Sequence, residues 1–214
     1  MLICWSGGAD STLLLAERLK AAEPVRTLSI VGLLNLRHND QQRQARKKIL
    51  AHYKDRKITW PHVEVIIDHH YPAGYKQHIQ LGGVLPGIWL AIACAHLDQD
   101  EELGIGFIKG DNAIHWLGSI EAAFAALQAI SSRTGVLRFP LEWLTKAQVL
   151  VGLKQHRLYG KIWWCEAPVN GRRCGRCAPC CTHATAQLVL KHRCDHKLHG
   201  QGLLASTVGI DKEK

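Results

Sequence analysis

The short stretch SGGADS at residues 6–11 constrains this chain more than any other feature, because it joins an apolar run to an amphipathic segment. Leu2–Trp5 predicts a short buried strand, and Ser11–Leu19 has the apolar spacing of a helix. Glycine lets the backbone turn sharply and approach a ligand closely. The unpaired N–H groups and the dipole at a helix start favour an anion. The sequence therefore predicts a phosphate site at this turn.

Length and composition are those of an ordinary globular protein. The chain has 214 residues, of which 47% are hydrophobic and 21% charged, enough for one large domain with a proper core. It contains no apolar run of about 18 residues, so neither a transmembrane helix nor a membrane partner is expected. The start carries no charged leader and no small-residue cleavage site, which predicts a cytoplasmic protein without a signal peptide.

The net charge of +9 is concentrated in two stretches, Arg37–Lys57 and Arg172–Lys197. A solvated helix face is one interpretation of such stretches. The other interpretation is a binding surface for a phosphate-bearing ligand or a nucleic acid, since clustered lysine and arginine attract both. Charge alone does not choose between them.

Strand-like and helix-like segments alternate over about the first 155 residues. Beyond the opening unit, the predicted strands are 25–34, 63–67, 103–108 and 136–139, and the predicted helices are 39–53, 84–97, 117–132 and 145–156. Thr145 and Gln148 have the spacing of a capping box at the start of the last helix. Repeated β-α-β units predict an α/β fold, Rossmann-like, with a parallel sheet and helices on both faces. Ligands of such sheets bind at the carboxyl ends of the strands.

Near Trp163 the sequence becomes rich in cysteine and loses its apolar periodicity, which divides the chain. Residues 1–160 form the predicted α/β domain, 161–199 a cysteine-containing appendage without clear periodicity, and 200–214 a tail. The appendage carries the pattern Cys165-x₈-Cys174-x₂-Cys177-x₂-Cys180. Four thiolates at this spacing favour a closed structural Zn²⁺ site.

Alternatives remain for the cysteines. An iron–sulfur cluster competes with zinc, and Cys181 or His183 are spare candidates for the fourth ligand. Cys4 and Cys94 stand in apolar runs and are expected to be small core residues. The histidines and cysteine within 192–199 suggest either a second metal site or a solvated basic segment.

The opening loop resembles the Ser-Gly-Gly-x-Asp-Ser signature of the PP-loop ATP pyrophosphatases, which belong to the adenine nucleotide alpha hydrolase-like fold. That resemblance implies an ATP site formed by the loop backbone and by two hydroxyls, with Asp10 holding Mg²⁺. The residues concerned are Ser6, Gly7, Gly8, Ala9, Asp10 and Ser11, and those expected to be catalytic are Asp10, Ser11 and Ser6.

Together with the cysteine pattern and the stretch Pro140–Val149, the loop resembles the 7-cyano-7-deazaguanine synthase family of queuosine-precursor biosynthesis. The resemblance implies a carbon–nitrogen ligase that uses ATP to activate 7-carboxy-7-deazaguanine. Ammonia would then attack, and a second activation would give the nitrile. Zn²⁺ would be structural, and a homodimer is a further expectation.

Two segments differ from that family's acceptor pocket. Ile88 and Trp89 stand where the family has a basic residue and an amide, and the polar loop 109–118 has a different order of polar residues. A related hypothesis follows from antiviral relatives of the synthase, namely attachment of a deazaguanine or another activated acid to a protein or nucleic acid.

Three further hypotheses are weaker on the sequence. A non-catalytic, zinc-containing nucleic-acid-binding module conflicts with the intact Ser6, Asp10 and Ser11. A PP-loop tRNA thiolase would need a reactive cysteine near the ATP site, for which only Cys4 and Cys94 are free. The stretch 66–70 resembles the Asp-His-His motif of manganese phosphoesterases but lacks the further aspartates that those enzymes need.

Overall fold

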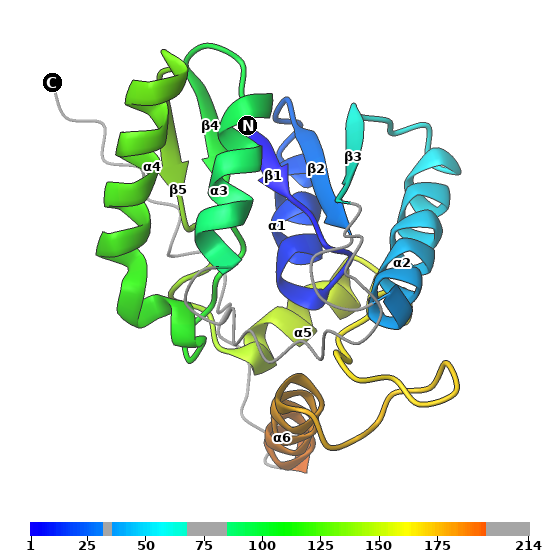
Figure 1. The fold of residues 1–214 in the computed structure, drawn as a ribbon. Helices are drawn as coiled ribbons and strands as arrows, with labels where there is room; N and C mark the ends of the chain where they lie inside the picture. The colour runs from blue at the N-terminus through cyan, green and yellow to red at the C-terminus, as the bar shows by residue number, and fades with distance from the viewer. Residues whose placement is uncertain (32–35, 68–84, 196–214) are drawn as a thin grey trace, which may run out of the picture.

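Five parallel strands form the central sheet of the computed structural model, which describes residues 1–31, 36–67 and 85–195. The strand order is β3-β2-β1-β4-β5, with β1 at the centre (Figure 1). The strands are β1 (Leu2–Cys4), β2 (Arg26–Val31), β3 (His62–Ile66), β4 (Glu101–Gly104) and β5 (Gly135–Arg138). All pairings in the sheet are parallel, as the β-α-β pattern predicts.

Helices cover both faces of this sheet. They are α1 (Ala9–Lys20), α2 (Leu36–Lys54), α3 (Leu85–His96), α4 (Leu117–Ser131), α5 (Lys146–Gln155) and α6 (Ala178–Asp195), with a 3₁₀ helix η1 at Asn112–Trp116. Successive residues of β1 alternate between two apolar clusters, since Ile3 packs with α1 and α5 whereas Leu2 packs with α3 and α4. The predicted two-sided α/β architecture is confirmed.

The carboxyl ends of the strands lie at the edge of the sheet nearest α5 and α6 (Figure 1). The turn after β1 therefore faces the part of the chain that follows the sheet. Helix α6 packs against α5 beyond this edge. The fold thus brings the cysteine-rich segment to the end of the sheet where ligands of parallel sheets bind.

Two sequence predictions need correction. The fourth strand spans Glu101–Gly104 and does not continue to residue 108. Two residues beyond Gly104, the backbone at Gly106 passes so close to Ser11 that a Cβ would lie 2.9 Å from the Ser11 nitrogen. The segment 161–199 also contains the long helix α6. The buried residues of α6 include Cys180, His183 and Ala186. The helix therefore lacks the stripe of large apolar residues by which an amphipathic helix is predicted from a sequence.

Several predictions lie wholly or partly outside the described residues. These are the end of the second strand (32–34), the Asp-His-His stretch beyond Ile67, and the tail from residue 196 onward. Within the described part, residues 112–131 form one helical segment whose length and mean hydropathy of 1.2 would suffice to cross a membrane. A single such segment is weak evidence for a membrane span.

The predicted capping box at α5 is present and gives a stability test. The Thr145 side chain accepts from the Gln148 N–H, and the Gln148 side chain accepts from the Thr145 N–H. Thr145→Ala removes the first of these bonds and should lower the free energy of unfolding by about 1 kcal/mol. Urea denaturation measures this loss. Gln44→Ala, at an exposed position of α2, is the control, and an equal effect of both substitutions would contradict the role of the cap.

Candidate phosphate-binding site and cysteine cluster

The turn between β1 and α1 has the backbone of an anion site. Gly7 has φ +84°, and a Cβ there would lie 2.9 Å from the Gln42 carbonyl oxygen, so both its conformation and its surroundings require glycine. Gly8 is the N-cap of α1 and provides no side chain to cap the helix. The first N–H groups of α1 are therefore open to an external acceptor.

The two hydroxyls of the predicted phosphate loop converge. The Ser6 Oγ lies 3.2 Å from the Ser11 Oγ and accepts the Gly8 N–H at 3.1 Å. The Ser6 N–H in turn donates to the Ser11 Oγ at 3.3 Å. The structure thus brings Ser6, Gly8 and Ser11 into one small polar cluster at the start of α1.

Asp10 is paired with a residue that sequence reasoning missed. The Lys146 Nζ lies 2.6 and 2.8 Å from the two Asp10 carboxylate oxygens. Lys146 is the first residue of α5, directly after the cap Thr145. The capping box located this lysine at a helix start, but only the packing of α5 on α1 shows that it reaches Asp10.

A second carboxylate lies close to this pair. Asp111 accepts the Ile108 N–H at 2.9 Å in the loop after β4. Burial raises the pKa of Asp111, the Ile108 N–H opposes this shift, and the negative charge of Asp10 adds to it. Asp10, Asp111 and Lys146 therefore form one electrostatically linked group at the carboxyl ends of β1 and β4.

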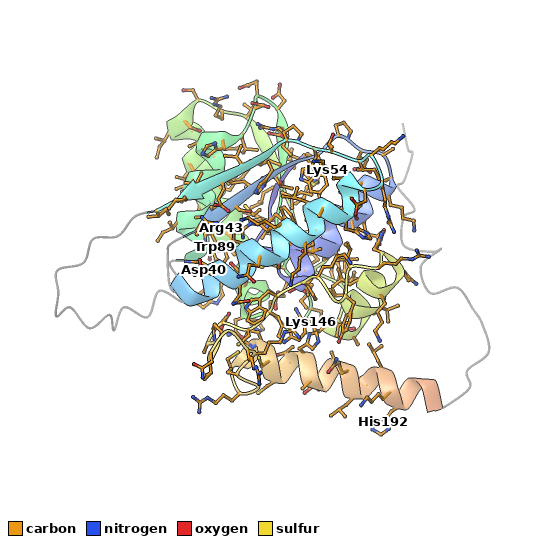
Figure 2. All side chains as sticks on the ribbon, turned by 90° about the vertical axis from the view of Figure 1, so that its right-hand side faces the viewer. Asp40, Arg43, Lys54, Trp89, Lys146 and His192 are labelled. Atoms are coloured by element: carbon orange, nitrogen blue, oxygen red, sulfur yellow. The ribbon has the colours of Figure 1, made fainter. Side chains whose placement is uncertain are left out.

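Helix α2 supports the loop from behind through a buried arginine. Arg46, whose side chain is 3% exposed, donates to the Ser6 carbonyl at 2.9 Å and pairs with Glu64 at 2.6 Å. Arg43 pairs with the same carboxylate of Glu64 at 2.6 Å (Figure 2 labels Arg43 on α2). One carboxylate on β3 thus orients two arginines, one of which holds the loop backbone.

The four predicted metal ligands come together. The Sγ atoms of Cys165, Cys174, Cys177 and Cys180 all lie within 4.8 Å of one another. Cys181 is exposed and lies outside this set, with its Sγ 3.6 Å from the Arg176 carbonyl oxygen. The structure therefore selects Cys180 from the adjacent pair.

Backbone N–H groups surround these thiols. The Cys174 Sγ accepts from the Arg176 and Cys177 N–H groups, which lower the pKa of Cys174 to about 6. Burial raises the pKa of Cys180 to about 12. A cation that binds here therefore competes with a proton more strongly at Cys180 than at Cys174.

His183, the other spare ligand, has a different role. Its ring stacks on Trp164 with centroids 3.5 Å apart, and the guanidinium of Arg173 lies 3.4 Å from the centroid of the same Trp164 ring. Burial, helped by the charges of Lys146 and Arg173, lowers the pKa of His183 to about 4. His183 is thus a neutral core side chain that attaches α6 to the segment before the cysteines.

A single stretch of backbone connects the cysteine cluster to the phosphate loop. The Trp163 N–H donates to the Gly7 carbonyl at 3.0 Å, and the Trp163 indole donates to the Cys165 carbonyl at 2.7 Å. Cys165, a member of the cluster, is therefore only two residues from a direct contact with the loop.

The sequence predicts that Cys4 and Cys94 are small core residues, and the structure places both in apolar surroundings. Cys94 is buried, and half-buried Cys4 packs in the same apolar cluster. Burial raises the pKa of Cys4 to about 12, with a smaller contribution from Cys94, so neither thiol is activated. Trp89 is half-buried on α3, while Trp116 on η1 is 62% exposed.

The sequence matches no protein-family model and no curated protein. Among solved structures, the chain is similar to the U34-tRNA thiolase NcsA from Methanococcus maripaludis, described with its 4Fe–4S cluster. The TM-score is 0.51 and the identity 16%, over 94% of this chain and 75% of that chain.

Two weaker likenesses are to the NMN synthetase from Francisella tularensis and to a predicted tRNA methyltransferase subunit from Methanocaldococcus jannaschii. The TM-scores are 0.47 and 0.43, with 18% and 15% identity. These matches cover 94% and 90% of this chain and 88% of each of those chains. The likeness to the thiolase shows a shared fold and agrees with the α/β class predicted from the sequence.

The Glu64 pairing predicts a defined pH dependence of stability. Burial raises the Glu64 pKa, but hydrogen bonds from Arg43 and Arg46 outweigh it and leave the pKa below its ordinary value of 4.5. A lowered folded-state pKa contributes stability above pH 4.5, and this contribution is lost as the pH falls through the folded-state pKa. Glu64→Gln should cost about 2 kcal/mol at neutral pH, less than for a fully buried pair.

Urea denaturation at a series of pH values measures this effect. The difference between the native chain and Glu64→Gln should shrink as the solution becomes more acidic. Glu102→Gln is the matched control, because Glu102 pairs with Arg138 at the surface and should matter little. A pH-independent difference for Glu64→Gln would show that the pairing is not its cause.

Proposed function

We propose that this chain uses ATP to activate a carboxylate for carbon–nitrogen bond formation. The observation that carries the proposal is the uncapped start of α1, where Ser6, Gly8 and Ser11 converge beside the pair Asp10–Lys146. Open N–H groups, hydroxyls and an ammonium suit the phosphates of a nucleotide.

The residues present fit both the nucleotide and its metal. Gly8, the N-cap of α1, has no side chain that could occupy the position of an anion at the helix start. Asp10 and Asp111 supply the carboxylate oxygens that Mg²⁺ prefers. Lys146 neutralises Asp10 in the free protein and is placed to contact a phosphate oxygen when Asp10 turns to a cation.

Activation of an acid needs such a site. A carboxylate is a poor electrophile until one of its oxygens carries an adenylyl or phosphoryl group, which ATP supplies. The chain would stabilise the negative charge that develops on the transferred and departing phosphates through the α1 N–H groups, Ser6, Ser11 and Lys146. Ammonia would then displace the activated oxygen to give an amide.

We infer the substrate class from the resemblance to the 7-cyano-7-deazaguanine synthase family. The Ser6–Ser11 loop and the four-cysteine pattern support a 7-carboxy-7-deazaguanine-like acid as substrate and ammonia as nucleophile. A homodimer is proposed on the same ground. The inactive state of the Cys4 and Cys94 thiols favours this ligase chemistry over sulfur transfer.

We propose that the cysteine cluster holds one Zn²⁺. Four thiolates around a single ion with Zn–S bonds of about 2.3 Å lie close to one another, and the Cys165 and Cys177 sulfurs are 4.0 Å apart. An iron–sulfur cluster distributes its thiolates over several irons and would space them more widely. With four protein ligands the ion has no open position, so its role is structural.

A second candidate keeps the activation step but changes the acceptor. Trp116 is 62% exposed and His115 beside it is also exposed, so η1 presents an open surface near Asp111. An open surface suits a protein amine or a nucleic acid, as in the antiviral hypothesis, better than it suits ammonia alone.

The decisive experiment supplies ATP, Mg²⁺ and 7-carboxy-7-deazaguanine, with and without ammonia, and identifies products by mass spectrometry. We expect ammonia-dependent amide or nitrile. Asp10→Ala and Ser6→Ala should abolish ATP consumption while leaving the far-ultraviolet circular dichroism spectrum unchanged, because both side chains belong to the phosphate site. Full ATP turnover by either folded variant would refute this site.

The same experiment separates the two acceptors. Consumption of ATP with accumulation of the activated acid, and no product with ammonia, would favour the macromolecular acceptor. If the acid is not turned over under any condition, the deazaguanine substrate is wrong.

The metal proposal predicts one equivalent of zinc per chain by elemental analysis. Cys174→Ser and Cys177→Ser should each lose most of the zinc and lower the thermal midpoint, because metal binding and folding are coupled. Cys181→Ser is the matched control and should keep the zinc. Iron with acid-labile sulfide, or a metal-free native protein, would overturn the assignment.

A further inference from the structure

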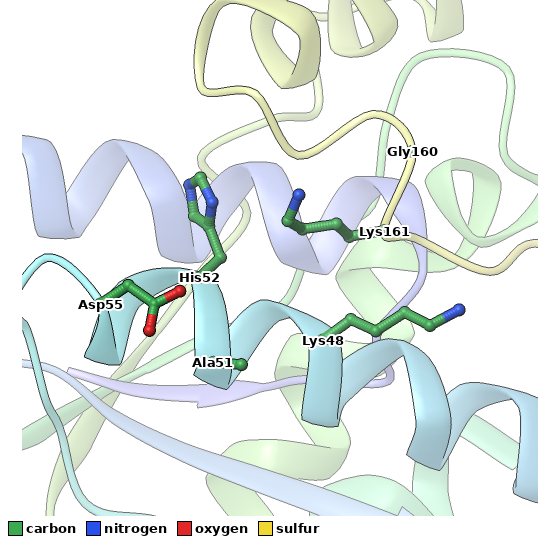
Figure 3. A pocket seen from close by; sticks show the side chains of 6 residues that line it. All are labelled: Lys48, Ala51, His52, Asp55, Gly160 and Lys161. Atoms are coloured by element: carbon green, nitrogen blue, oxygen red, sulfur yellow. The ribbon is translucent and has the colours of Figure 1, made fainter.

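A pocket outside the phosphate loop opens between α2 and the turn that follows α5 (Figure 3). Its volume is about 530 Å³, within the range of ligand sites. It is lined by Lys48, Ala51, His52, Asp55, Gly160 and Lys161. Lys48, His52 and Asp55 share one side of α2 or its end, while Gly160 and Lys161 form the opposite wall.

The charged side chains that line this pocket are two lysines and one aspartate, an excess of one positive charge. Within the described residues, Lys48 and Lys161 form no ion pair, and the His52 Nε2 is buried without a hydrogen-bond partner. Asp55 is the single carboxylate among the lining residues. Burial and the charges of Arg56 and Lys161 lower the pKa of His52, so His52 is neutral at pH 7 and adds polarity without charge.

Positive charge continues beyond the pocket along the same end of α2. Lys47, Lys54, Arg56 and Lys57 are all exposed there (Figure 2 labels Lys54). Arg43 and Arg46 share Glu64 and are occupied by it, so they do not contribute free cations. Several exposed basic side chains thus surround the pocket, and clustered positive charge of this kind suits a chain of phosphates better than a single small anion.

The pocket adjoins the phosphate loop through the segment that follows α5. Lys161 is two residues from Trp163, which donates to the Gly7 carbonyl. Two residues of extended chain span about 7 Å, so a ligand beside Lys161 would lie next to the loop.

We propose that this pocket binds the phosphodiester backbone of a nucleic acid and holds it beside the phosphate loop. Lys48 and Lys161 would contact phosphate oxygens from opposite walls. The site deepens the second candidate function, since it would bring a nucleic-acid acceptor to the activated acid. Phosphate contacts of this kind position a strand without selecting its sequence.

Fluorescence anisotropy tests the proposal with labelled RNA and DNA oligonucleotides, single-stranded and duplex, in the absence of ATP. Lys48→Ala/Lys161→Ala should weaken binding about tenfold and reduce the slope of log affinity against log salt by about 2. Lys20→Ala/Arg133→Ala makes the same change in net charge at exposed positions on other elements and should have a much smaller effect. Circular dichroism confirms that both double variants fold.

Ser6→Ala separates this proposal from the ATP site, because it removes a hydroxyl of the phosphate loop without a change in net charge and should bind the oligonucleotides as the native chain does. Preference for RNA or for DNA identifies the source of the phosphodiester. The proposal is overturned if the native chain binds neither at low salt, or if the two double variants lose affinity equally. It is also overturned if an acidic peptide of equal charge competes as well as the oligonucleotide.

Discussion

The backbone at Ser6 and Gly7 is held in place by hydrogen bonds from two distant parts of the chain. The Gly7 carbonyl accepts the Trp163 N–H, and the preceding Ser6 carbonyl accepts from Arg46. Any side chain at Gly7 would collide with the Gln42 backbone. The turn is therefore fixed by α2 on one side and by the segment leading to Cys165 on the other. Remote parts of the chain therefore determine the geometry of the loop N–H groups, which our proposal assigns to a phosphate.

Much of the architecture follows from the sequence because its signals are local. The alternation of apolar segments indicates the parallel sheet, and the Thr145–Gln148 pair marks the start of α5. The glycine turn and the cysteine spacing likewise identify two polar clusters that the structure contains. In each case neighbouring residues carry the information, so periodicity and spacing are sufficient.

What the sequence does not predict depends on tertiary packing. Lys146 reaches Asp10, 136 positions away, only because α5 lies against α1. The role of His183 follows from its stack on Trp164, which no spacing rule encodes. Helix α6 was missed because its buried side is made of cysteine, histidine and alanine. The close approach of α1 to the backbone at Gly106, just past the end of β4, is likewise a tertiary feature.

The bond between Trp163 and Gly7 joins main chain to main chain, and this has a consequence for divergence. The Trp163 contribution is an N–H group that every residue type except proline possesses. Natural variation could replace the indole while the support of the loop persisted. Such support would leave no trace in a comparison of residue identities, whereas it would remain visible in a comparison of backbones. Distant chains of this fold could thus inherit the same loop geometry after their sequences have ceased to resemble one another.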